Sequence, residues 1–142
     1  MEPILGFNKE YRFLSNFYGA TVELDGLEYR STEHAYQAAK TLDAAERRRI
    51  REAEKANEAK QLGQNVKKRP EWEEIKVSVM KELVKQKFTK HKDLKEKLLA
   101  TGDAYLEETN HWHDTFWGVC KGKGQNHLGK ILMEVREELK RE

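Results

Sequence analysis

The sequence predicts a mainly α-helical domain with a small antiparallel β-hairpin, and an α+β domain is the alternative fold class. Two observations support this prediction. Apolar residues recur at helical spacing over roughly 71–88 and 126–140. Residues 22–29 instead alternate around an Asp25-Gly26 pair, which is typical of a hairpin with a two-residue turn. Because 142 residues is the usual size of one domain, we expect a single domain over residues 1–142.

Composition narrows the functional class. Charged residues make up 37% of the chain and hydrophobic residues another 37%, which indicates a globular protein with wet helix faces. A net charge of +2 is too small to predict nonspecific nucleic-acid binding by the whole surface. Cys120 is the one cysteine, so no internal disulfide can form. With no signal segment and no long apolar run, we expect a cytoplasmic protein that does not enter a membrane.

The hairpin comes first along the chain, and its turn sets its register. The cross-strand pairs expected are Leu24 with Leu27, Glu23 with Glu28, and Val22 with Tyr29. The leucines, Val22 and Tyr29 then form an apolar face, while the two glutamates share the other face and are expected to be solvated.

The helices follow in order. Ser31 or Thr32 is expected to cap a short helix that ends near Lys40, and a charged helical stretch then covers residues 43–60. Pro70 suits the entry to a core helix over roughly 71–88. A short helix near 93–99 is expected to end at Thr101-Gly102, and a last helix covers roughly 126–140. The segment from 104 to 109 is expected to be extended.

The short helix carries the most informative pattern. At 100° per residue, the polar residues Glu33, Tyr36, Gln37 and Lys40 share one stripe. Ala35, Ala38, Ala39 and Leu42 fall on the opposite side, which predicts close packing there. An acid, an amide and an amine on one rigid stripe are suited to catalysis. The alternative interpretation is a solvated face of ordinary helix-forming residues.

Lys40 suggests a particular chemistry. A lysine on an alanine-packed helix can be held partly out of water, and desolvation favours its neutral amine. A neutral amine is a nucleophile that forms an imine with an aldehyde carbon, and Glu33 on the same stripe can transfer protons. An ordinary surface lysine is the alternative.

Three further segments carry polar and aromatic groups. Ser15 and Asn16 can donate and accept hydrogen bonds beside aromatic rings such as Phe17. Glu107-Glu108 precede Trp112, Asp114 and Trp117, and carboxylates near indoles suit proton transfer, although Asp114 can equally cap a turn.

The third segment is residues 121–126, where Lys121 and Lys123 alternate with glycines before the last helix. It is either an anion site or a flexible loop. His111 and His113 with Asp114 lack a third and fourth ligand at helical spacing, so we expect no metal.

The order of these blocks resembles the NADAR family, also called the YbiA-like family. The matching blocks, which cover nearly the whole chain, are Phe13-Leu14-Ser15-Asn16-Phe17, Asp25-Gly26, the segment Glu33 to Lys40, Trp72 with Met80, Lys87-Phe88, Thr101-Gly102, Glu108, Asp114 with Trp117-Gly118, Gly124 to Gly129, Leu132-Met133 and Arg136. Two departures are that Gly19-Ala20 replaces a proline often found there and that His113 stands where members often have glycine.

The resemblance implies a mainly helical fold and an N-glycosidase that cleaves the bond between ribose C1 and an exocyclic amine, without a cofactor. Family members act on phosphorylated intermediates of riboflavin biosynthesis or on ADP-ribosylated guanine in nucleic acid. The residues it implies for catalysis are Lys40, Glu33, Glu108 and Asp114. Those it implies for substrate binding are Ser15, Asn16, Phe17, Tyr36, Gln37, Trp72, Trp117, Gly118 and Asn126.

Two mechanisms and one other function remain open. Lys40 can form a Schiff base with ribose C1, or Asp114 or Glu108 can activate water for direct hydrolysis. The alternative function is a non-catalytic module that binds ADP-ribose or a related nucleotide.

Overall fold

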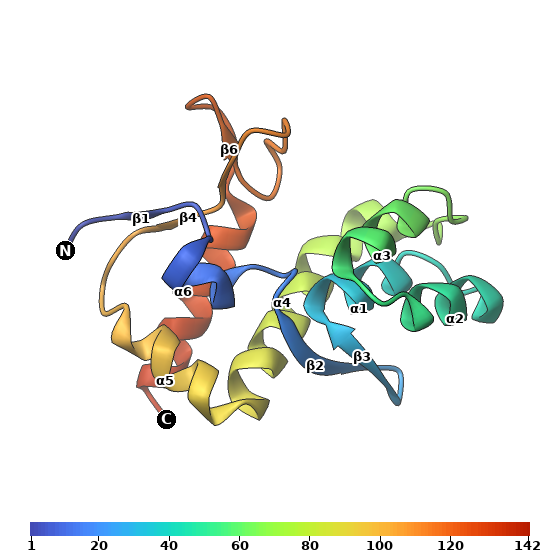
Figure 1. Cartoon of the computed structure of the whole chain (residues 1–142), viewed down its shortest axis with the longest axis horizontal. Helices are drawn as coiled ribbons and strands as arrows, with labels where there is room; N and C mark the ends of the chain where they lie inside the picture. The colour runs from blue at the N-terminus through green and yellow to red at the C-terminus, as the bar shows by residue number, and fades with distance from the viewer. The chain divides into compact units, whose positions relative to one another are not determined.

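The computed structural model describes all 142 residues, which form two compact units. One unit is Asn16–Lys90, and the other combines Met1–Ser15 with His91–Glu142 (Figure 1). Helices dominate both, so the mainly α-helical fold class is confirmed. None of the helices is both long and apolar enough to span a lipid bilayer.

The unit Asn16–Lys90 is organised around one short helix. Its elements in order are β2 (Gly19–Leu24), β3 (Leu27–Ser31), α1 (Thr32–Ala39), α2 (Ala44–Glu52), α3 (Ala56–Gly63) and α4 (Trp72–Lys90). Helix α1 contacts both strands and all three other helices of the unit (Figure 1). The helix that carries the candidate catalytic residues is therefore the centre of this unit.

The predicted hairpin is confirmed, register included. Val22 pairs with Tyr29, Glu23 with Glu28 and Leu24 with Leu27. Asp25 and Gly26 have φ of 49° and 83°, the two positive values that a type I′ turn requires. Val22 and Tyr29 are buried, whereas Leu27 is 50% exposed, so the apolar face reaches the core only away from the turn.

Helix α1 begins where the sequence predicts. The Ser31 hydroxyl accepts a hydrogen bond from the His34 amide at 3.1 Å and lies 2.7 Å from the His34 ring. The prediction of one packed and one open side is wrong, because all eight residues of α1 are buried. Leu42, placed on the packed side, lies beyond the end of the helix and is 63% exposed.

The charged stretch over residues 43–60 is two helices rather than one. Asp43 caps α2 by accepting from the Glu46 amide at 2.9 Å. Ala53 has a ψ of 132°, which ends α2, and α3 begins three residues later at Ala56. This break turns α3 back so that it packs against α1 and α2.

Helix α4 supplies much of the core of this unit. Trp72, Met80, Leu83, Val84 and Phe88 are buried, as the sequence predicts. Ile75 and Val79, predicted on the same apolar row, are only half-buried. Lys87 is buried with 1% exposure and lies 5.6 Å from the Tyr18 ring centroid and 5.1 Å from that of Phe88.

The other unit combines short parallel strand pairs with helices. Its elements are β1 (Ile4–Leu5), η1 (Lys9–Leu14), α5 (Lys92–Ala100), β4 (Leu106–Glu107), β5 (Thr109–Asn110), β6 (Val119–Cys120) and α6 (His127–Lys140). Strand β1 pairs with β4, and β5 pairs with β6. Helix α6 packs on β4 and α5 (Figure 1).

Helix α6 buries the apolar face that the sequence predicts. Leu128, Ile131, Leu132, Val135 and Leu139 are each at most 3% exposed. At the end of α5, Gly102 has a φ of 65°, the left-handed conformation expected of a residue that terminates a helix. The extended segment expected between 104 and 109 contains β4 and the start of β5.

Candidate functional site

Lys40 lies at the carboxyl end of α1, half-buried beside charged groups. Burial lowers the pKa of its ammonium group below the ordinary lysine value. The neighbouring Glu33 carboxylate opposes that shift in the pKa, while Lys68, Lys60 and Lys76 add to it. Its Nζ lies 5.8 Å from the centroid of the Tyr36 ring. Lys40 is thus a partly desolvated amine close to an acid, in agreement with the environment expected from the sequence.

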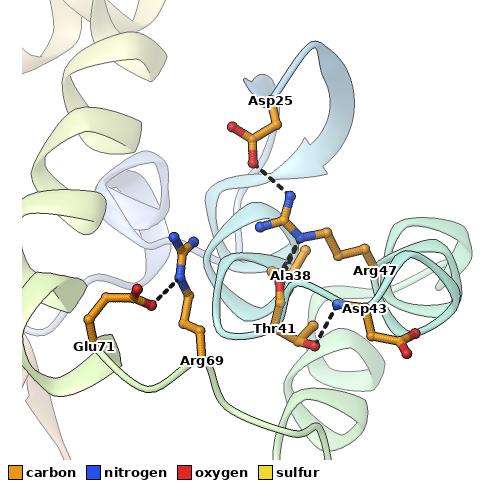
Figure 2. A network of polar contacts seen from close by, with 7 residues as sticks. All are labelled: Asp25, Ala38, Thr41, Asp43, Arg47, Arg69 and Glu71. Atoms are coloured by element: carbon orange, nitrogen blue, oxygen red, sulfur yellow. Dashed lines mark hydrogen bonds and ion pairs between the residues drawn. The ribbon is translucent and has the colours of Figure 1, made fainter.

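Backbone contacts hold this end of α1 in place. The Lys40 carbonyl accepts from the Arg69 amide at 2.7 Å. The Arg47 Nε donates to the Ala38 carbonyl at 3.1 Å and to the Thr41 carbonyl at 2.7 Å, on either side of Lys40. Figure 2 shows the Arg47 guanidinium between these carbonyls and the hairpin. The backbone that carries Lys40 is therefore fixed from two directions.

Two ion pairs extend this arrangement (Figure 2). Arg47 Nη1 lies 2.6 Å from an Asp25 carboxylate oxygen, which ties the hairpin turn to α2. Arg69, whose amide holds Lys40, also pairs through its side chain with Glu71 at 2.7 Å. A guanidinium whose side chain is 14% exposed and that bonds two carbonyls and a carboxylate has little freedom, so this end of α1 is rigid.

Glu33 and Gln37 form a buried pair one helical turn apart on α1. Gln37 Nε2 donates to Glu33 Oε2 at 2.6 Å. Glu33 is 7% exposed and Gln37 is 4% exposed. The Glu33 backbone amide donates to the Asn16 carbonyl at 3.0 Å, which joins the segment before the hairpin to α1. The acid therefore has a fixed position relative to the helix that carries Lys40.

Aromatic residues of the same unit lie near these groups. The Tyr36 and Trp72 rings have centroids 5.3 Å apart and are tilted by 53°. Trp72 is only 2% exposed and belongs to the core, whereas Phe17 is 42% exposed. The Lys60 Nζ lies 5.9 Å from the Phe17 ring centroid. Phe17 thus has a partly exposed ring next to a cation.

Asn16 has a different environment from its neighbour Phe17. It is 8% exposed, and its Nδ2 donates to the Met80 sulfur at 3.4 Å. Its carbonyl accepts from Glu33, so both ends of the residue contact protein. The residues predicted for the site within this unit are Asn16, Phe17, Glu33, Tyr36, Gln37, Lys40 and Trp72.

The other predicted site residues belong to the second unit. They are Ser15, Glu108, Asp114, Trp117, Gly118 and Asn126. Ser15 ends the short helix η1, where its amide donates to the Arg12 carbonyl at 3.0 Å. The remaining five lie in β4 to α6 or in the loops between these elements.

Asp114 shapes the aromatic-rich loop. One oxygen of its carboxylate accepts from the Phe116 amide at 3.1 Å and from the Trp117 amide at 2.9 Å. Asn110 holds the same loop by accepting from the Asp114 amide and donating to its carbonyl, at 3.1 and 2.9 Å. Asp114 thus has the turn-capping contacts that the sequence left open as an alternative. Asn110 was missed, because its bonds depend on the shape of the loop and a single asparagine in a loop does not reveal that shape.

Asn126 joins β4 to the start of α6. Its Oδ1 accepts from the Glu108 amide at 3.0 Å, and its Nδ2 donates to the Leu106 carbonyl at 3.0 Å. It is 2% exposed and has a φ of 53°. Gly118 lies so close to the Glu108 carbonyl that a Cβ there would overlap it. These contacts place the Glu108 backbone.

The segment before α6 does not leave the helix amides open. The His127 amide donates to the Phe116 carbonyl at 3.1 Å and the Leu128 amide to the Trp117 carbonyl at 3.0 Å. The anion-site interpretation of residues 121–126 is therefore wrong as far as these amides are concerned, because carbonyls of the aromatic loop occupy them. The rings of Phe116, Trp117 and His127 gather at the same place, with the Phe116 and His127 centroids 4.5 Å apart.

No group of three or more His, Cys, Asp or Glu side chains is arranged to hold a metal ion.

Arg47 and Gly63 were missed by sequence reasoning, although both contact α1. Arg47 is one of three consecutive arginines, and nothing in the sequence distinguishes it from Arg48 and Arg49.

The chain is similar to proteins of known family. The NADAR domain matches residues 6–140. A riboflavin biosynthesis protein from Vibrio vulnificus is 40% identical over 135 residues, which cover 93% of this chain and 36% of that protein. The N-glycosidase YbiA from Escherichia coli is 38% identical over 133 residues, which cover 92% of this chain and 82% of that protein.

The fold agrees with these matches. The NMR structure of E. coli YbiA superimposes with a TM-score of 0.87 at 34% identity, covering 99% of this chain and 88% of that one. The chain spans about a third of the Vibrio protein, so that protein has a large part with no counterpart here. On the family match and these relatives, the chain belongs to the NADAR family.

Proposed function

We propose that this protein is an N-glycosidase that hydrolyses the bond between ribose C1 and an exocyclic amine. The observation that carries the proposal is the half-buried Lys40 amine beside the buried Glu33 carboxylate. Burial lowers the pKa of this amine. The relatives named N-glycosidase support the same reaction class. The one cysteine, Cys120, is a buried free thiol, which is typical of proteins from a reducing compartment. We therefore propose that the protein acts in the cytoplasm.

Lys40 acts as the nucleophile in this proposal. An N-glycoside of an exocyclic amine opens to an imine when the bond between C1 and the ring oxygen breaks and the proton of the amine N–H passes to that oxygen. The neutral Nζ of Lys40 then adds to C1, and a proton passes from Nζ to the leaving amine. Departure of that amine leaves the sugar as an imine on Lys40, and water hydrolyses this imine to release ribose as the aldehyde.

Glu33 transfers the protons. It lies on the same helix as Lys40, and its charge acts on Lys40 strongly enough to oppose the lowering of the pKa. Because Gln37 and the helix hold the carboxylate, it is positioned before substrate arrives, which lowers the cost of each proton transfer. Direct hydrolysis by Asp114 is less favoured, because two backbone amides already bind one oxygen of its carboxylate.

The charges near Lys40 suggest a phosphorylated substrate. Lys60, Lys68 and Lys76 all act electrostatically on Lys40, and Lys76 also pairs with Glu73 at 2.7 Å. Clustered ammonium groups attract phosphate, and the exposed Phe17 ring beside Lys60 offers a stacking surface for a heterocycle. We therefore propose a phosphorylated amine riboside of riboflavin biosynthesis, and the ADP-ribosyl group on guanine as the second candidate.

Substrate contacts are also proposed for the remaining predicted residues. In the unit Asn16–Lys90 these are Asn16, Phe17, Tyr36 and Trp72, with Trp72 acting through the Tyr36 ring that it supports. In the other unit they are Ser15, Trp117 and Gly118. Asn126, predicted for binding as well, is 2% exposed and bonds Glu108 and Leu106, so its proposed part is to hold Glu108 in place.

The test is product release measured by mass spectrometry together with borohydride trapping. The purified protein is given phosphorylated amine ribosides of the riboflavin pathway or an oligonucleotide that carries ADP-ribosylated guanine. We expect release of the ribose product and, on reduction during turnover, a covalent adduct on Lys40. Lys40→Ala should lose both, while Lys130→Ala, an exposed lysine of α6, should keep both.

Each other outcome selects an alternative. Turnover without an adduct on Lys40 would support direct hydrolysis, and Asp114→Asn then identifies the base, because asparagine keeps the oxygen that caps the turn. Binding of ADP-ribose without turnover of either substrate would support the non-catalytic module instead.

A further inference from the structure

The Gln37 side chain has an unusual environment for a buried amide. Its Nε2 donates to Glu33, but its Oε1 is buried without any hydrogen-bond partner. A buried acceptor without a partner normally costs stability, so its position calls for a reason. The orientation of the amide follows from its neighbour, because the Glu33 Oε2 atom accepts from the NH₂ group and the Oε1 atom of Gln37 therefore faces away from it.

The reason lies on α3, which packs against α1. Gly63 is the last residue of α3, and the Gln37 amide lies directly against it. A Cβ at Gly63 would overlap Oε1 of Gln37 and would lie 2.7 Å from its Cδ and 2.9 Å from its Cβ. Contacts that short do not occur, so a side chain at position 63 would displace Gln37.

Backbone conformation does not explain the glycine. Gly63 is not among the residues with positive φ, so alanine could adopt its helical conformation and is a better helix former. Gly19 also lacks a positive φ, but a Cβ there would meet nothing within 4 Å. Space for Gln37, rather than helix geometry, is therefore what position 63 supplies.

We propose that Gly63 is a positioning residue whose missing side chain lets the Gln37 amide lie between α1 and α3, where it donates to Glu33 and orients that carboxylate. The effect of this positioning on catalysis rests on the proposed function, in which Glu33 transfers protons. It also changes the part of Gln37, which sequence reasoning placed in substrate binding. With one end of its amide on Glu33 and the other against Gly63, Gln37 holds the acid rather than the substrate.

The test is a double-mutant cycle on Gly63→Ala and Gln37→Ala, with Gly19→Ala as the matched glycine control. We expect Gly63→Ala and Gln37→Ala each to lower kcat about tenfold while KM changes less than about twofold. The double variant should have the kcat of Gln37→Ala alone, since no amide is then left to displace and the added methyl meets only the Cβ of residue 37, at 2.9 Å. The double variant should also have a higher melting temperature than Gly63→Ala. The control Gly19→Ala should have the kcat and the melting temperature of the wild type.

Two results of the cycle would overturn the inference. Gly63→Ala could lower kcat by the same factor in the wild type and in the Gln37→Ala variant. Its effect would then come from the general packing of α3. If KM rises while kcat is kept, Gln37 contacts the substrate after all.

A spectroscopic measurement separates this inference from the proposed function. The NMR resonances of the Gln37 side-chain NH₂ group should differ from those of the wild type in the variant Glu33→Gln. They should also differ from those of the wild type in Gly63→Ala. If these resonances shift in both variants but the wild type has no glycosidase activity, the positioning role of Gly63 stands and the proposed function is refuted. Resonances that Gly63→Ala leaves in place would overturn the positioning role itself.

Discussion

Lys40 and Lys87 show what burial does to a single amine. Both belong to the unit Asn16–Lys90, and burial is the largest cause of the lowered pKa in each. Lys40 is half-buried with a carboxylate nearby, whereas Lys87 is almost fully enclosed and its pKa falls to about 7. The first environment suits a nucleophile, and the second is a cost to stability.

The pH dependence of turnover tests the role of Lys40. Only the neutral amine attacks, so kcat/KM should rise with pH as Lys40 loses its proton. Because its pKa is lowered, the rise should level off below pH 10.5, the ordinary lysine value. A pH–rate profile measures this, with Lys40→Arg as the control that keeps charge but cannot form an imine. A profile that falls through this range would contradict the proposal.

The pH dependence of stability tests Lys87. Its pKa is about 7 in the folded protein against 10.5 for the ordinary group. Between these values the unfolded chain binds more protons, so the contribution of Lys87 to the free energy of unfolding rises with pH from about 7 upward. We expect Lys87→Met to be more stable than the wild type at pH 6, with a difference that narrows toward pH 9. Urea unfolding across this range gives the difference, and a constant value would contradict the prediction.

At the scale of elements, α1 depends on neighbours that bond its backbone. Its amino end is capped by Ser31, and the carbonyls near its carboxyl end are held by Arg47 and by the Arg69 amide. An eight-residue helix is too short to be stable by itself. Contacts from β2, β3, α2, α3 and α4 therefore decide where Glu33 and Lys40 lie.

Arg47→Met measures this dependence. The substitution removes the side-chain donor from the Ala38 and Thr41 carbonyls and breaks the pair with Asp25, and we expect a loss of about 2–3 kcal/mol in the free energy of unfolding. Arg48→Met is the matched control, since its side chain is 77% exposed and pairs only with Glu52 on the same helix. That control should change stability by less than about 0.5 kcal/mol. Equal effects at the two positions would mean that the contacts of Arg47 add nothing.

At the scale of the whole molecule, the net charge of +2 conceals a local excess of positive charge around Lys40. Local charge, rather than net charge, attracts an anionic substrate, and salt screens that attraction. Net charge alone therefore does not report the charge that surrounds Lys40.

Salt dependence tests this electrostatic contribution. We expect kcat/KM for a phosphorylated substrate to fall as ionic strength rises from about 0.01 to 0.15 M, because the screening length shortens about fourfold. Lys68→Gln should lower kcat/KM at low salt and flatten the dependence, and exposed Lys130→Gln on α6 should do neither. A rate independent of salt would refute phosphate attraction by these lysines.

Local sequence signals determined most of the secondary structure. The Asp25-Gly26 turn set the hairpin register, Ser31 set the start of α1, and Gly102 followed the end of α5. Such features depend on a few adjacent residues, whose backbone preferences and short hydrogen bonds are the same wherever the segment lies. The apolar face of α6 was predictable for a similar reason, since its spacing repeats along one helix.

The sequence by itself determined the fold class and the hairpin, and it placed Glu33 on α1 and Lys40 at the end of that helix. Only the tertiary structure decided that α1 is buried on every side, that Gln37 holds Glu33, and that Arg47 rather than Arg48 anchors the helix. Burial and hydrogen bonds between distant segments depend on how elements pack, and no short stretch of sequence encodes that packing.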